Sequence, residues 1–225
     1  MKKCLLLVLA IMLLLSLGGV VSCGPTTVTF PDPNLETAIR EAINKPEGSI
    51  YPSDLEGLTS LDALGRNITD LTGLDKCSNL TRLVLDGNQI SDISPLASLT
   101  NLTALGLMFN QVDDVSPLAS LTNLRSLHLN FNRITDISPL GSLTNLTNLE
   151  LMGSPDGNQI TDISALGSLT NLTQLRLWNN QISDISPLVS LTNLRTLWIL
   201  QGNPLSTESV NVYIPQLEER GVEVH

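Results

Sequence analysis

The sequence predicts an α/β solenoid: a curved right-handed superhelix with a parallel β-sheet on its concave face, short 3₁₀ turns on its convex face and a helical cap at each end. The main observation is a 22-residue unit that recurs almost unchanged at residues 100–121 and 122–143. A unit of this length cannot bury its apolar face alone, so successive units must stack. Each unit also contains a Leu-x-Leu segment and a Ser-Pro-Leu segment, which predict the strand and the turn.

The signature of each unit runs L-x-x-L-x-L-x-x-N-x-I-x-D-I-x-P-L-x-x-L, as from Leu80 to Leu99. In the Leu-x-Leu segment the leucines point into the core and the intervening residues point outward, as strand geometry requires. An asparagine recurs where each strand ends, and its amide can pair with backbone groups that the turn would otherwise bury unpaired. We expect these asparagines to be structural: Asn88, Asn110, Asn132, Asn158, Asn180 and Asn203.

The back of each coil carries Ser-Pro-Leu, at Ser94, Ser116, Ser138 and Ser186. Serine as the N-cap and proline as the first helical residue predict one short 3₁₀ turn. The fourth unit has Ala165 in place of the proline and keeps the pattern. Strands on one side and tight turns on the other predict a curve that is concave on the strand side.

An aspartate recurs at the turn onto this back face. Two interpretations are open: each carboxylate accepts backbone amides of its own turn, or a cation is held between neighbouring carboxylates. The residues are Asp70, Asp92, Asp114, Asp136, Asp162 and Asp184.

With this pattern the chain resembles the leucine-rich repeat proteins, and in particular the bacterial internalin-like class. The resemblance runs from about Phe30 to the last residue and includes both caps. It implies the curved solenoid described above. It also implies a surface or secreted protein that holds another protein on its concave face.

We expect caps at both ends of the repeats, because an open stack end exposes apolar surface and a sheet edge together. Residues 30–77 are expected to form a helical N-terminal cap and a degenerate first repeat, residues 78–203 the leucine-rich repeats, and residues 204–225 the C-terminal cap. Asp32 before Pro33 marks a helix start. Pro215 should break or restart the closing helix, and Gly221 should end it.

Residues 1–22 have the layout of a signal peptide, with Lys2, Lys3, a leucine-rich run and small residues before Cys23. Val-Val-Ser-Cys at residues 20–23 resembles a bacterial lipobox, which implies that Cys23 is lipidated and that residues 23–29 form a lipid-anchored tether. The expected location is then the cell envelope, at the outer surface. Three alternatives are open: cleavage near Gly24 that leaves a secreted protein, an uncleaved segment that remains as an anchor, or a disulfide between Cys23 and Cys77. Without that disulfide, Cys77 is expected to be a buried thiol with a structural role.

The chain has 22 acidic and 12 basic side chains, for a net charge of −10. A surface of this sign repels nucleic-acid phosphates and anionic lipid headgroups, and no cluster of Lys and Arg offsets it locally. We therefore expect no nucleic-acid partner, membrane contact only through the N-terminal lipid, and a monomer.

The outward strand positions form three columns that vary from unit to unit while the frame hardly changes. A recognition surface would show such variation, and so would drift at unconstrained positions. Tryptophan and arginine dominate the binding energy of protein interfaces, so the candidate ligand-binding residues on the concave face are Trp178, Arg176, Met152, Glu150, His128, Met108, Trp198 and Asn130. Counting back from Asn203 instead places Trp198 inward and Ile199 outward. Phe109 and Phe131, beside the asparagines, are expected to pack against the coil edge.

His128, Glu150 and Arg176 should be neighbours in one column, because adjacent strands lie about 4.8 Å apart. They could form an acid/base set or a solvated cross-strand charge pair. No positioned nucleophile, glycine-rich phosphate loop or metal-ligand spacing accompanies them. We therefore predict no catalytic residue, no metal site, no cofactor and no enzymatic activity.

Taken together, these features predict an exported, surface-anchored protein that binds another protein on its concave face. The alternative is a structural or carbohydrate-binding cell-envelope lipoprotein without a dedicated protein ligand.

Overall fold

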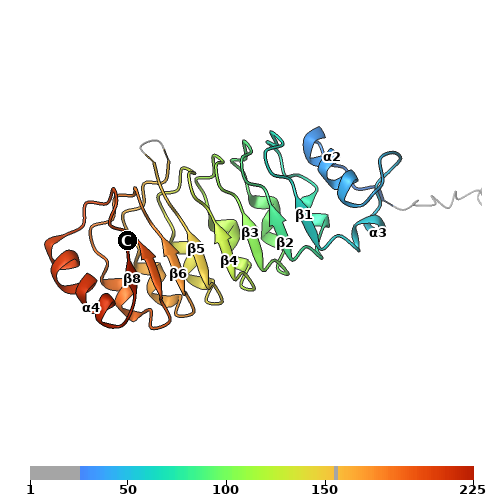
Figure 1. Cartoon of the computed structure of the whole chain (residues 1–225). Helices are drawn as coiled ribbons and strands as arrows, with labels where there is room; N and C mark the ends of the chain where they lie inside the picture. Colours follow the sequence, from blue (N-terminus) through green and yellow to red (C-terminus); the bar gives the residue numbers. More distant parts are fainter. Residues whose placement is uncertain (1–25, 155–156) are drawn as a thin grey trace, which may run out of the picture.

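A single sheet of short parallel strands runs the length of the molecule, with a helical segment at each end (Figure 1). The computed structural model describes residues 26–154 and 157–225. Each strand is two or three residues long: β1 (Ser60–Asp62), β2 (Arg82–Val84), β3 (Ala104–Gly106), β4 (Ser126–His128), β5 (Asn148–Glu150), β6 (Gln174–Arg176), β7 (Thr196–Trp198) and β8 (Glu223–Val224).

The eight strands are hydrogen-bonded in sequence order, and every pair is parallel. The register places equivalent residues of successive units side by side, as with Leu83, Leu105 and Leu127. The middle residue of each three-residue strand points inward and is buried. The predicted solenoid, its parallel sheet and its outward columns are therefore confirmed.

Short 3₁₀ turns form the opposite side of the coils and follow one another in space as the strands do. They are Leu74–Lys76, Ser94–Ser98, Ser116–Ser120, Ser138–Ser142, Ser164–Ser168 and Ser186–Ser190. The turn at Ser164 forms without the proline, as predicted. Leucine and isoleucine side chains from the strands, loops and turns fill the space between the two sides as one continuous core.

The predicted role of the asparagine column is confirmed. In one coil, Asn132 Oδ1 accepts the Val112 amide at 3.0 Å, while its Nδ2 donates to the carbonyls of Leu107 (2.8 Å) and Leu129 (3.1 Å). Leu107 and Val112 belong to the preceding coil, so each asparagine joins two coils. Equivalent bonds recur along the column at Asn88, Asn110, Asn158, Asn180 and Asn203.

The capping of the 3₁₀ turns differs from the prediction. The serine side chain makes no cap hydrogen bond, and the serine is itself the first residue of the turn. The preceding aspartate caps the turn instead: Asp92 Oδ1 accepts the Ser94 amide at 2.8 Å, and the other aspartates of the column make the same bond. The aspartate lies two residues before the serine, and from there its carboxylate reaches the serine amide without strain. The serine side chain is too short to accept a hydrogen bond from the amide of its own residue.

The N-terminal cap consists of α2 (Pro33–Ala42) and the short α3 (Pro52–Leu55). Asp32 starts α2 as predicted: its Oδ1 accepts the amides of Asn34 (2.8 Å) and Leu35 (3.1 Å). Its Oδ2 accepts the Thr69 amide of the first coil at 2.7 Å, so the same carboxylate ties the cap to the stack. Burial would raise the pKa of Asp32, but these backbone hydrogen bonds outweigh it and lower the pKa.

The C-terminal cap closes the other end with a π-helical turn at Ser209–Tyr213 and with α4 (Ile214–Glu219). Pro215 lies in the first turn of α4, and Gly221 follows the helix with a left-handed φ of 84°, as predicted for a restart and an end. The sequence did not predict that the chain then returns to the sheet as β8, beside β7.

Cys77 is a free, buried thiol, as expected for a structural role without a disulfide. The predicted signal peptide and Cys23 lie outside the described residues. None of the described helices is both long enough and apolar enough to cross a membrane.

Replacing a buried asparagine should destabilise the fold much more than replacing an exposed one. We expect Asn132→Ala to lower the free energy of unfolding by about 3 kcal/mol, because it leaves the Val112 amide and the Leu107 carbonyl buried and unpaired. Asn145→Ala removes an exposed bond to the Thr122 carbonyl and should cost less than about 1 kcal/mol. Urea unfolding followed by circular dichroism measures both, and equal losses would contradict this role.

The burial of Cys77 should make the free energy of unfolding depend on pH under alkaline conditions. Burial raises the pKa of this thiol to about 12, whereas the pKa of a thiol in the unfolded chain is about 8.5. A folded pKa above the unfolded one means that the stabilising effect is complete below about pH 8.5 and is lost as pH rises toward about 12. The free energy of unfolding should therefore fall more steeply above pH 8.5 than in Cys77→Ala, by up to about 1.4 kcal/mol per pH unit. Parallel pH curves for the two proteins would refute this.

Candidate functional site

The concave face of the sheet carries the candidate residues in the predicted columns. Trp178, Arg176, Met152, His128, Met108 and Trp198 are all half-buried, with part of each side chain open to solvent. The structure resolves the ambiguity in the last coil: Ile199 is fully buried and Trp198 points outward. The extra residue of this coil is taken up after the strand, next to Gly202, whose φ is 72°.

Glu150 and Asn130 differ from the prediction that they lie open on this face. Glu150 is only 6% exposed and Asn130 is fully buried. Asn130 Nδ2 donates to Glu150 Oε2 at 2.7 Å, and Asn130 Oδ1 accepts the Met152 amide at 2.8 Å. Asn130 and Glu150 therefore stabilise the packing between coils: Asn130 Nδ2 is paired with Glu150 Oε2, and Asn130 Oδ1 is paired with the Met152 amide.

Glu150 also fixes the position of Arg176, whose Nη1 donates to Glu150 Oε1. The Arg176 guanidinium lies over the Trp198 ring, 4.5 Å from its centroid, and Trp198 stacks on His225 with ring centroids 5.4 Å apart. Trp178 Nε1 donates to the His225 carbonyl at 3.2 Å. These contacts hold the C-terminal third of the face in one arrangement before any ligand arrives.

Phe109 and Phe131 form an aromatic pair that the sequence reasoning assigned to the coil edge. Their rings stack with centroids 4.5 Å apart, and Phe109 is 56% exposed. Both residues have left-handed φ values, 54° and 57°. The same position holds Gly87 and Asn179, residue types that accept this conformation at lower cost. A bulky residue at a position that favours glycine or asparagine was the signal in the sequence that could have revealed the pair.

His128 is the backbone neighbour of Glu150, as predicted, but their side chains are not linked. His128 Nε2 lies 3.0 Å from both Ser126 Oγ and Asn148 Nδ2. His128, Glu150 and Arg176 thus do not form one acid/base set. Within residues 26–154 and 157–225, no three His, Cys, Asp or Glu side chains are grouped as metal ligands.

A hollow of about 80 Å³ lies on the sheet face at strand β3, because both outward residues of this strand, Ala104 and Gly106, are small. Arg82, Asp86, Ser126 and His128 also line it. Asp86 Oδ1 accepts the Met108 amide at 2.7 Å. Burial raises the pKa of Asp86 above its ordinary value, although that bond and His128 act in the opposite direction.

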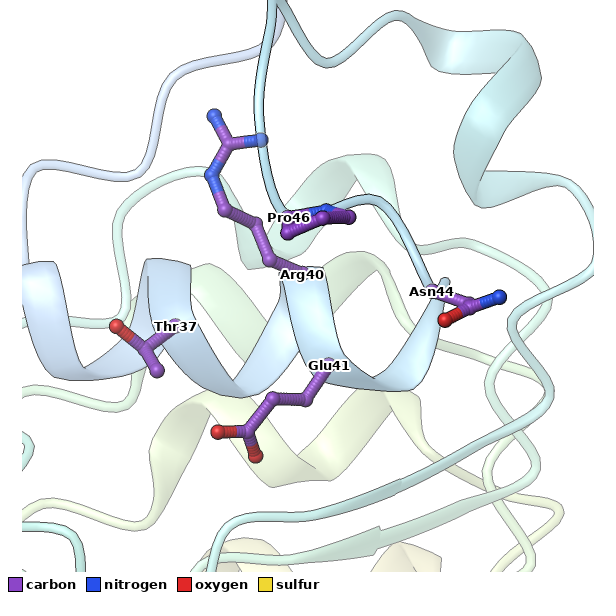
Figure 2. Close-up of a pocket in the computed structure, with 5 residues that line it drawn as sticks. All are labelled: Thr37, Arg40, Glu41, Asn44 and Pro46. Carbon is purple, nitrogen blue, oxygen red and sulfur yellow. The ribbon is translucent and has the colours of Figure 1, made fainter.

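A larger, open hollow of about 450 Å³ lies against α2, lined by Thr37, Arg40, Glu41, Asn44 and Pro46. In Figure 2, Arg40 and Glu41 project from this helix in opposite directions. Arg40 donates to Glu36 and to the Lys45 carbonyl, while Glu41 pairs with Arg66 at 2.7 Å. The charged groups of this hollow are therefore paired within the cap, and the sheet face remains the candidate site.

Breaking the ion pair at the centre of this face should destabilise the protein. Arg176→Ala leaves Glu150 buried with Asn130 as its remaining partner, and we expect a loss of about 2 kcal/mol, because Arg176 is itself about one-third exposed. Arg133→Ala, at an exposed arginine outside the strands, should change stability by less than about 0.5 kcal/mol. Urea unfolding tests both, and a neutral Arg176→Ala would show that the pair contributes nothing to the frame.

Comparison with known proteins identifies the repeats. Residues 78–120, 122–168, 156–188 and 170–211 match the family described as leucine-rich repeats (2 copies). No curated protein sequence matches the chain significantly.

Solved structures give a closer assignment. An internalin C2 from Listeria monocytogenes is 35% identical, with a TM-score of 0.64 over 84% of this chain and 94% of that protein. A second internalin, InlF of the same organism, is 31% identical, with a TM-score of 0.58 over 91% of this chain and 72% of that protein. A leucine-rich repeat protein of Leptospira interrogans, 23% identical over 78% of this chain and 51% of that protein with a TM-score of 0.56, shares the fold. On the repeat match and on the identity with these internalins, the chain belongs to the leucine-rich repeat family, in its bacterial internalin-like class.

Proposed function

We propose that this protein is exported, is anchored at the cell surface and binds another protein on the concave face of its sheet. An internalin-like leucine-rich repeat domain is a protein-interaction domain, which supports a protein partner. The family resemblance supports export as well, because internalin-like proteins are surface or secreted bacterial proteins.

The observation that carries the proposal is the exposed apolar edge of the sheet face. Phe109 and Leu200 are 56% and 47% exposed, and both lie on loops that leave the strands. Met108, Met152 and Trp178 continue the apolar strip between them, half-buried. Exposed apolar side chains gathered on one face favour a protein interface.

The rigidity of the face favours binding in a second way. The strands under the strip are tied coil to coil by the asparagine column, and Arg176 and Trp198 are held by Glu150 and His225. A partner that docks on side chains already in place loses less conformational entropy than one that must order them.

The N-terminal anchor is part of the proposal and rests on the resemblance of residues 20–23 to a lipobox. Val28 is already paired with Ile50 of the N-terminal cap, through a hydrogen bond of 2.8 Å. Val28 is the fifth residue after Cys23, a span of at most about 18 Å. A lipid on Cys23 would therefore keep the cap close to the membrane surface.

Carbohydrate binding is the second candidate, and the stacked Phe109 and Phe131 rings favour it, since flat aromatic faces also suit sugar rings. Such a protein would retain glycans rather than a polypeptide. The experiment below separates the two.

Removing the apolar strip should abolish capture of the partner without unfolding the protein. The bait is the chain from Gly24 to His225, presented to surface and secreted proteins of the producing organism and to a glycan array. We expect Phe109→Asn with Leu200→Ser to reduce capture at least tenfold, because both side chains lose their contact area. Asparagine fits the left-handed backbone at position 109, as it does at Asn179, so the melting temperature should stay within a few degrees.

The matched control is Val210→Ser with Val212→Ser, which removes two similarly exposed apolar side chains from the C-terminal cap. It should leave capture unchanged. Equal loss with both pairs, or no loss with either, would count against the sheet face as the binding site. Retention of glycans alone would favour the second candidate.

A further inference from the structure

We propose that Asp86 and Gly106 form a subsite on the concave face that receives a positively charged side chain, lysine or arginine, of the bound protein. This inference rests on the proposed function and specifies one contact within it. It follows from the shape of the hollow, from an internal comparison with Asn130 and from the charges around the hollow.

Gly106 has no side chain and so leaves room on the sheet face for the Asp86 carboxylate. A Cβ atom at position 106 would lie 2.7 Å from Asp86 Oδ2, so any other residue would displace the carboxylate. The φ of Gly106 is not left-handed, and the backbone therefore does not need a glycine there. The small residue at this position of strand β3 instead lets the Asp86 carboxylate lie across it.

Asn130 occupies the same position two coils later and makes the same backbone contact. Its Oδ1 accepts the amide of Met152, as Asp86 Oδ1 accepts the amide of Met108. The second polar atom of Asn130 donates to Glu150, which in turn binds Arg176. Both oxygens of the Asp86 carboxylate lie against Gly106, and Oδ2 accepts no hydrogen bond from any residue in the described part of the chain.

Asn130 and Asp86 thus occupy equivalent positions. The second polar atom of Asn130 has a hydrogen-bond partner in the chain, Glu150, whereas the second oxygen of Asp86 has none among the described residues. At Glu150 a carboxylate on this face is matched by the guanidinium of Arg176. At Asp86, Arg82 and His128 lie near enough to act on the carboxylate, but neither forms an ion pair with it, so a directly paired cation would have to come from another molecule. Ionised carboxylates form their strongest hydrogen bonds with ammonium and guanidinium donors.

The charges around the hollow favour a cation over an anion. Asp62 and Asp86 contribute two negative charges against one permanent positive charge, on Arg82; His128, Asp62 and Arg82 all lie near enough to influence Asp86. His128 Nε2 is already shared between Ser126 and Asn148. An anionic ligand would meet the unpaired Asp86 oxygen directly.

The raised pKa of Asp86 shows that its ionised form is poorly compensated in the folded chain. An asparagine at position 86 could accept the Met108 amide as Asn130 accepts the Met152 amide, without the free-energy cost of burying an ionised carboxylate. A carboxylate that lowers stability where a neutral side chain would serve is the pattern expected of a binding residue.

The binding test is an NMR titration of the chain from Gly24 to His225 with ethylguanidinium chloride, an analogue of the arginine side chain. We expect saturable shifts of the Gly106 and Met108 amides in the unaltered protein. Asp86→Asn, which keeps the bond to Met108, should raise the half-saturation concentration about tenfold. Tetramethylammonium, which has the charge but no N–H donor, should bind more weakly than ethylguanidinium.

The matched control is Asp62→Asn, which removes the neighbouring charge and leaves Asp86 intact. It should change the half-saturation concentration less than twofold. The absence of saturable shifts, equal binding by Asp86→Asn, or an equal effect of Asp62→Asn would overturn the proposal. None of these outcomes affects capture by the apolar strip, so the proposed function stands or falls separately.

A stability measurement tests the same residue without any ligand. A folded pKa above the unfolded value means that Asp86 destabilises the protein as pH rises through that folded pKa. Asp86→Asn should therefore melt at a higher temperature than the unaltered protein at pH 7, and the gain should vanish below about pH 3.9. A lower melting temperature for Asp86→Asn at pH 7 would show that the carboxylate serves the frame, and would overturn the subsite.

Discussion

Each coil from β2 to β7 leaves the sheet through a buried corner, and the amide of one asparagine supplies hydrogen bonds that the backbone at this corner would otherwise lack. The asparagine bonds both to its own coil and to the coil before it, as Asn132 does to Leu129 and to Leu107. A coil cannot slide or rotate relative to its neighbour without breaking these bonds. The register of the sheet, and hence the alignment of the outward side chains, depends on this column.

The face built on that frame contains two kinds of side chain. Asn130, Glu150, Arg176 and Trp198 are linked to one another and hold their neighbours in place. Phe109 and Leu200 stand outside this linked group, although Phe109 stacks on Phe131, and both expose much of their surface. The first group gives the face its shape, and in the proposed function the second would give a partner the apolar area that drives association.

Two features of this face lower the stability of the folded chain. Phe109 and Phe131 hold a backbone conformation that favours glycine or asparagine, and Asp86 keeps an ionised oxygen where the frame needs only an amide acceptor. The internalin-like relatives share the fold of the solenoid. Because a fold of this kind serves many ligands, the specificity of this chain must lie in such local departures from the repeat.

The sequence by itself determined the fold, because the spacing of leucine, asparagine and aspartate recurs in every unit and each has a single physical role at its position. It also determined which strand positions face outward, except in the last coil, where the structure decided between Trp198 and Ile199. Only the tertiary structure decided which outward residues remain open, since Glu150 and Asn130 are buried by contacts between coils that a linear pattern does not contain. The same is true of Trp198, whose partners Arg176 and His225 come from the neighbouring strand and from the end of the chain. Periodicity fixes the direction of a side chain, whereas its exposure depends on the size and polarity of the residues stacked above and below it.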